Sequence, residues 1–272
     1  MKALFKYIIA LLIIVACGYV ACKKGQSSST TYFNSPDLTK QIAVGFYSSL
    51  IGQYGGANIN DGITAPGGIN LTNKGPGISS VNSFCGYTID TTYTYNQTAG
   101  DTVRKFITHY KFTYGCTANV LDSYSLADSI TNTETGPLFA NSSILTQNYF
   151  VKALDQTNKT ASVEGSIGTS FHTSVLNTSH VVTQYNNIDT KYVLSGVKVD
   201  ITSGTANITS GIATFTTQVR NLDPTTPFSG YSSVFTGTIT FLSNHMAHVS
   251  ISTGNQTKLY TVNLITAEVT AG

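Results

Sequence analysis

Apolar side chains recur at two spacings along the chain, and each spacing predicts a different element. Ser35 and Pro36 suit the start of a helix, and Gly55-Gly56 suits its end. Between these signals, apolar residues recur every four positions, as on one face of an α-helix: Leu38, Ile42, Phe46 and Leu50. A membrane-surface helix needs a basic polar face, and Lys40 is the single cation here. We therefore predict that helix 36–54 packs on a sheet.

Apolar and polar residues alternate over residues 84–116, which predicts a β-hairpin. Gly100-Asp101 has the Gly-X form of a type II′ turn, and folding about it pairs residues that are equidistant from the turn. Cys85 then lies opposite Cys116, and we predict a disulfide between them. The same register places seven aromatic side chains on one face: Tyr87, Tyr93, Tyr95, Phe106, Tyr110, Phe112 and Tyr114.

Most of the remaining chain has the composition of strands separated by turn residues. The expected strands are 118–130, 148–154, 161–171, 173–185, 192–202, 211–220, 231–242, 247–252 and 259–269. We predict an all-β fold, an antiparallel meander of about ten strands that forms a curved sheet, a barrel-like sheet or a sandwich, with the helix packed on it. Residues 35–272 are expected to form one domain, because large antiparallel sheets often reach this length.

The composition agrees with this fold and excludes one class of partner. Of the 272 residues, 10% are charged, against about 25% in ordinary soluble domains. The net charge is +2, and the few Lys and Arg residues are not clustered. Binding to nucleic acid by neutralising phosphates needs a basic surface, so we expect no nucleic-acid partner.

The first residues have the features of a secretory leader. Lys2 and Lys6 precede an apolar run over residues 7–16, which is short for a transmembrane helix. Ile14-Val15-Ala16-Cys17 resembles the bacterial lipobox, in which the chain is cut before a cysteine that is then lipidated. The alternative is Cys22, because Ala-Cys-Lys-Lys-Gly at residues 21–25 resembles the lipoprotein leaders of Bacteroidota.

The resemblance to exported lipoproteins of the Bacteroidota type covers residues 1–25. It implies a signal peptide over residues 1–16, or 1–21, and lipid attachment (palmitate) at Cys17, or at Cys22. Residues 17–34 then form a polar tether. The leader lacks the acidic run that resembles a surface-export signal, so we expect an outer-membrane lipoprotein that faces the periplasm. An exported chain also permits the Cys85–Cys116 disulfide.

Few residues suggest catalysis or metal binding. The chain has no Gly-x-Ser-x-Gly, no His-Glu-x-x-His and no glycine motif for phosphate. His245 and His248 are three residues apart in an expected strand, and such positions point to opposite faces. We therefore assign no catalytic, cofactor-binding or metal-binding residue.

Two functional classes remain. We favour a membrane-anchored cell-envelope lipoprotein with a non-enzymatic binding or structural role, whose partner is an apolar ligand, a glycan or a protein. The alternative is a lipid-anchored hydrolase that acts on envelope or glycan substrates. The seven aromatic residues of the hairpin are the candidates for lining a cavity, although such stripes more often serve the core. A helix inside a curved sheet would resemble in outline the lipoprotein-carrier type of half-barrel, and this likeness leaves the function open.

Overall fold

The computed structural model describes residues 35–63, 85–222 and 231–272. Within these ranges the chain forms helix α2, Ser35–Leu50, a short 3-10 turn η2, Ile59–Asp61, and eleven strands. The strands are β1 Thr88–Ala99, β2 Thr102–Thr117, β3 Val120–Gly136, β4 Phe139–Ala153, β5 Thr160–Leu176, β6 Val182–Asp200, β7 Asn207–Leu222, β8 Tyr231–Leu242, β9 Met246–Thr253, β10 Gln256–Asn263 and β11 Val269–Ala271. The leader cysteines Cys17 and Cys22 lie outside the described residues.

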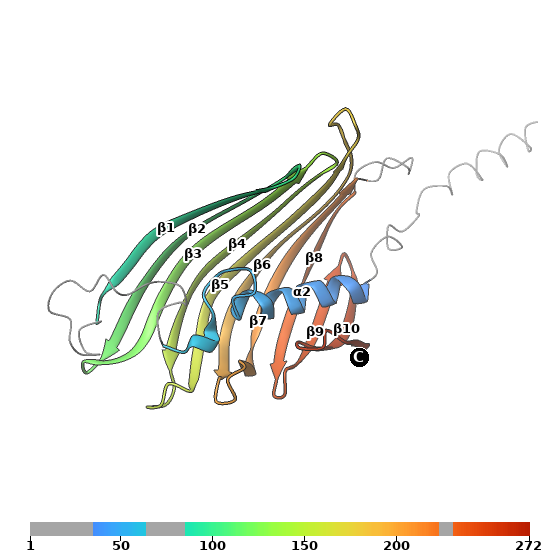
Figure 1. Ribbon diagram of the computed structural model, residues 1–272. Coiled ribbons are helices and arrows are strands. Elements are labelled where there is room, and N and C mark those ends of the chain that lie inside the picture. Colours follow the sequence, from blue (N-terminus) through green and yellow to red (C-terminus); the bar gives the residue numbers. More distant parts are fainter. Residues whose placement is uncertain (1–34, 64–84, 223–230) are drawn as a thin grey trace, which may run out of the picture.

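All eleven described strands belong to one antiparallel sheet, and their spatial order follows the chain from β1 to β11. The sheet is open, because β1 and β11 are its two edges. Figure 1 shows that it is curved and that α2 lies across one face. The prediction of an all-β meander with one N-terminal helix packed on it is confirmed, and the curved sheet is the form it takes. We call the face against α2 the inner face and the opposite face the outer face.

The core lies between α2 and the inner face. Phe46 is fully buried, and its ring stacks on Phe241 of β8 with centroids 5.1 Å apart. It also makes an edge-to-face contact with Tyr192 of β6, with ring centroids 5.3 Å apart. Complete burial of one large apolar side chain stabilises a fold by about 1.5–3 kcal/mol. The four-residue apolar spacing of the helix therefore serves core packing.

The helix ends four residues earlier than the sequence predicts, at Leu50 rather than residue 54. Gly52 takes a left-handed conformation with φ of 72°. The N–H of Gln53 then bonds to the carbonyl of Ser48 at 2.9 Å, which is the hydrogen bond of a Schellman cap. Because the helix stops here, Tyr54 leaves its axis and packs edge-on against Phe171 of β5, with centroids 5.2 Å apart.

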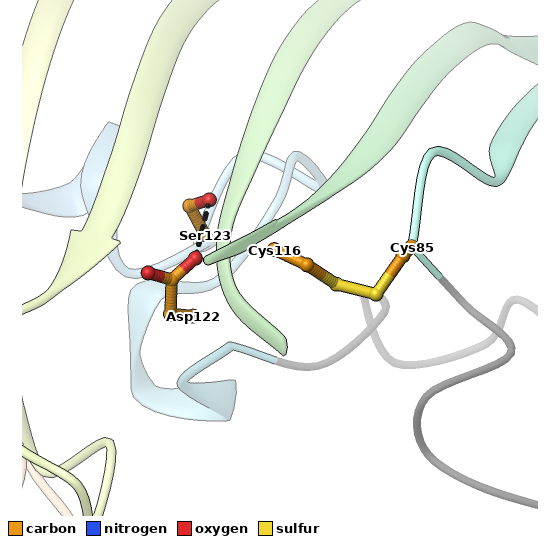
Figure 2. The surroundings of a disulfide bond; sticks show 4 residues. All are labelled: Cys85, Cys116, Asp122 and Ser123. Atoms are coloured by element: carbon orange, nitrogen blue, oxygen red, sulfur yellow. Dashed lines mark hydrogen bonds between the residues drawn. A yellow bond between two sulfur atoms is a disulfide. The ribbon is translucent and has the colours of Figure 1, made fainter. Parts of the chain in front are cut away.

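The first hairpin has the predicted register. Tyr95 pairs with Phe106, and Ile89 pairs with Phe112. At the turn Gly100 has φ of 57°, as the first central position of a type II′ turn requires. Cys85 and Cys116 form the predicted disulfide, with their Cα atoms 5.4 Å apart. Figure 2 shows this bond joining the end of β2 to the residues just before β1.

The prediction of one strand over residues 173–185 is wrong, because β5 ends at Leu176 and β6 begins at Val182. The side-chain oxygen of Asn177 accepts hydrogen bonds from the N–H groups of Ser179 and Val181, which closes a turn. The predicted strand 259–269 is likewise divided into β10 and β11. There the Asn263 side chain accepts from Ile265 and Thr266.

Candidate functional site

Four polar side chains join α2 and the segment that follows it to the rest of the protein. The Tyr192 hydroxyl donates to the carbonyl of Ile42 at 2.9 Å. The Tyr47 hydroxyl donates to the carbonyl of Ala206 at 2.8 Å. Gln147 of β4 donates to the carbonyl of Ser49 at 2.9 Å and accepts from the N–H of Ala57 at 3.0 Å. The Tyr110 hydroxyl donates to the carbonyl of Gly55. These bonds hold the helix at a fixed place on the inner face.

A cavity of about 300 Å³ lies between α2 and strands β5 and β6. Most of its walls are apolar. The described residues that line it are Lys40, Gln41, Ile42, Val44, Gly45, Tyr54, Thr169, Phe171, Ile188, Thr190 and Tyr192. Lys40 and Gln41 are exposed, whereas Ile42 and Tyr192 are buried, so the cavity runs from the solvent into the core. Burial raises the pKa of both Tyr54 and Tyr192, as in a poorly hydrated environment.

The sheet register brings the walls of this cavity together. Thr169 pairs with Thr190 and Phe171 pairs with Ile188 across β5 and β6, so these side chains project from one patch of the inner face. Gly45 faces them from the helix. A Cβ atom added at Gly45 would lie 3.7 Å from the Tyr192 hydroxyl, so the missing side chain leaves space that the cavity occupies.

The aromatic residues proposed from the sequence do not line this cavity. Phe112 and Tyr114 are buried in the core, where Phe112 stacks on Tyr124 of β3 with centroids 4.6 Å apart. Of the other five, Phe106 and Tyr110 lie on β2, Tyr93 and Tyr95 lie on the edge strand β1, and Tyr87 directly precedes β1. Phe106 and Tyr110 are half-buried, and the exposed residues are Tyr87, Tyr93 and Tyr95, at 40%, 44% and 59%.

Sequence reasoning missed the cavity residues because it missed the turn at Asn177. The alternation of apolar and polar residues before Phe171 predicted part of β5. Without the turn, however, the partner positions on β6 could not be assigned, since a strand register follows from the turn that precedes it. The contribution of Tyr54 depended in addition on the early end of the helix at Gly52.

A buried carboxyl group lies on the inner face, next to the two side chains that bind residues 55–57. Asp128 of β3 pairs with Tyr110 on one side and Gln147 on the other, and both of these side chains bind the segment above it. The Thr108 hydroxyl donates to Asp128 Oδ1 at 3.4 Å, whereas Oδ2 has no hydrogen-bond partner among the described residues. Burial raises the pKa of Asp128 to about 7, although the Thr108 hydroxyl opposes this shift.

Two histidines are hydrogen-bonded to aspartates on the outer face. His109 lies 2.7 Å from Asp90, and His172 lies 2.9 Å from Asp189. Partial burial raises the pKa of Asp189, but hydrogen bonds from Ser170 and His172 and the charge of Arg220 bring it below its usual value. Within the described ranges no hydroxyl or thiol is hydrogen-bonded to His109 or His172. These pairs therefore lack the activated nucleophile of a hydrolase triad.

The described residues contain no group of three or more side chains arranged to hold a metal ion. They also contain no helix of sufficient length and apolar character to cross a membrane. Comparisons with protein families, with curated proteins and with solved structures found no match. The cavity between α2 and the inner face is therefore the candidate site that the described residues themselves define.

Proposed function

We propose that this protein is a lipid-anchored protein of the cell envelope that binds an apolar ligand between α2 and the sheet. The cavity carries the proposal. Its volume of about 300 Å³ is at the lower end of the range of about 300–1,000 Å³ that is usual for small-molecule sites. The position in the envelope is supported by the lipobox-like residues around Cys17 and Cys22.

The cavity is suited to binding because its walls are already in place. The bonds from Tyr192 to Ile42 and from Gln147 to Ser49 fix the helix on the sheet. A ligand would therefore not have to order the helix, and less of its binding energy would be lost on entry. Each methylene group that leaves water for the cavity would contribute about 0.8 kcal/mol.

The cavity can be tested as a binding site by filling it with a larger side chain on α2. Gly45→Leu adds four carbon atoms where Gly45 faces the hydroxyl groups of Tyr192 and Tyr54, and we expect it to weaken binding of a fluorescent acyl probe at least tenfold. Val193→Phe is the matched control. Val193 is exposed on the outer face of β6, so the same added bulk should leave binding unchanged. Equal probe affinity in Gly45→Leu and the wild type would refute the cavity as the site.

The membrane anchor needs its own experiment. Intact mass spectrometry of the membrane-extracted protein, with Cys17→Ser and Cys22→Ser made separately, should show loss of processing and lipid mass in one variant. We expect this change because a lipobox is cut and lipidated only at its cysteine, which serine cannot replace. A wild-type protein without added lipid mass would contradict the anchor and leave the cavity test unaffected.

A further inference from the structure

The lining of the cavity has one charged member. Among the described residues that border it, Lys40 alone carries a formal charge. Lys40 is exposed on α2, so its ammonium group lies toward solvent, at the open end. No ion pair joins it to an acidic residue within the described ranges. The ammonium group of Lys40 is therefore available to a ligand, at the solvent-exposed end of the apolar cavity.

The size of the cavity limits the ligand further. At about 300 Å³ it has room for one alkyl chain, and a lipid with two long chains would leave one of them in water. Its inner walls, Ile42, Phe171 and Ile188, offer apolar contacts to such a chain. Two polar residues of the lining, Thr169 and Thr190, are buried and carry no charge, so they could not neutralise a charged group inside.

We propose that the ligand is a single-chain amphiphile with an anionic head, of the fatty-acid type. The tail lies in the cavity and the head lies against Lys40. This inference rests on the proposed function, and it adds the chemical class of the ligand. A neutral alkyl chain would make no use of the ammonium group, and a cationic head would be repelled by it.

The experiment compares three ligands with the same alkyl chain by calorimetry at low salt: dodecanoate, dodecanol and dodecyltrimethylammonium. The wild type should bind the acid most tightly and the ammonium compound most weakly. Lys40→Met keeps the apolar stem and removes the charge. It should weaken dodecanoate binding by about two- to five-fold, which corresponds to an exposed ion pair, and leave dodecanol binding unchanged.

Lys152→Met is the matched control, because Lys152 is an exposed lysine on the outer face of β4 and its loss changes the net charge equally. Dodecanoate affinity in this variant should equal that of the wild type. Two results would overturn the inference on the head group while the cavity function stands: equal binding of acid and alcohol by the wild type, or equal losses in the two lysine variants. Failure of all three ligands to bind would overturn the proposed function as well.

Discussion

Burial of Asp128 makes the stability of the fold depend on pH. Its side chain is buried on the inner face, with a residue exposure of 5%, and one carboxyl oxygen has no partner among the described residues. Burial raises the folded-state pKa to about 7 from the ordinary value of 3.8. A difference of about three pKa units corresponds to about 4 kcal/mol, since each unit is worth about 1.4 kcal/mol.

Whether stability rises or falls with pH depends on which state, folded or unfolded, binds the Asp128 proton more tightly. Because the folded protein holds the Asp128 proton more tightly than the unfolded chain, this group stabilises the fold at low pH. Its contribution to the free energy of unfolding is fully present below about pH 4. It is lost progressively as the pH rises through the folded-state pKa of about 7, and it changes no further above that pH.

Asp128→Asn removes the titrating group and keeps the shape of the side chain. Urea denaturation followed by circular dichroism at pH 5 and pH 8 should give the wild type a loss of about 3 kcal/mol that the variant lacks, because about two pKa units lie between pH 5 and the folded-state pKa. Asp101→Asn, in the exposed hairpin turn, is the control and should follow the wild type. Parallel pH profiles for Asp128→Asn and the wild type would refute the reasoning.

Three further predictions concern the fold. Reduction of the Cys85–Cys116 disulfide, which closes a loop with a sequence separation of 31, should lower the free energy of unfolding by about 2–4 kcal/mol; recovery of both thiols free in non-reducing peptide maps of the native protein would contradict it. Phe112→Ala should cost about 3–5 kcal/mol because the ring is fully buried, whereas Tyr95→Ala, at an exposed position, should cost less than about 1 kcal/mol in the same melts. Gly165 lies at an irregularity in the pairing of β5 with β6. Gly165→Ala should cost more than about 1 kcal/mol, because φ is 135° and the new Cβ would lie 2.3 Å from the carbonyl oxygen of Asn148; a thermal midpoint equal to that of the wild type would show that this irregularity relaxes freely.

The parts of the fold that the sequence predicted are those with local causes. Gly100 determines the hairpin turn, and the position of this turn determines every pair from Ile89 to Tyr95 and brings Cys85 to Cys116. The four-residue spacing of the helix is local in the same sense. Such features need no knowledge of distant residues, because the turn and the side-chain alternation define them.

The candidate site has non-local causes, and the sequence did not reveal it. Lys40 and Ile42 meet Phe171 and Ile188 through the register of β5 and β6, and that register depends on a turn made by the Asn177 side chain. Asn is so frequent in this chain that its turn-forming positions do not stand out. The unpartnered oxygen of Asp128 was equally hidden, because it depends on how the segment after the helix crosses the sheet.

The sequential strand order has a consequence for how the molecule folds. Strands β1 to β11 pair with their neighbours in the chain, so the sheet can grow by closing one short hairpin after another, each with a small entropic cost. Helix α2, in contrast, is held by contacts between residues that are far apart in the chain. Its anchors Tyr47–Ala206 and Ile42–Tyr192 join residues 159 and 150 positions apart.

Helix α2 is therefore synthesised before the sheet and docked late. Until β6, the chain around Ala206 and β8 have been made, Phe46 and Tyr47 lack the groups that cover them, and these side chains remain open to water. Exposed apolar surface of this kind promotes aggregation and recruits chaperones. We expect hydrogen exchange during refolding to protect the β2–β3 pair before the amides of α2, which makes helix docking the closing step of folding.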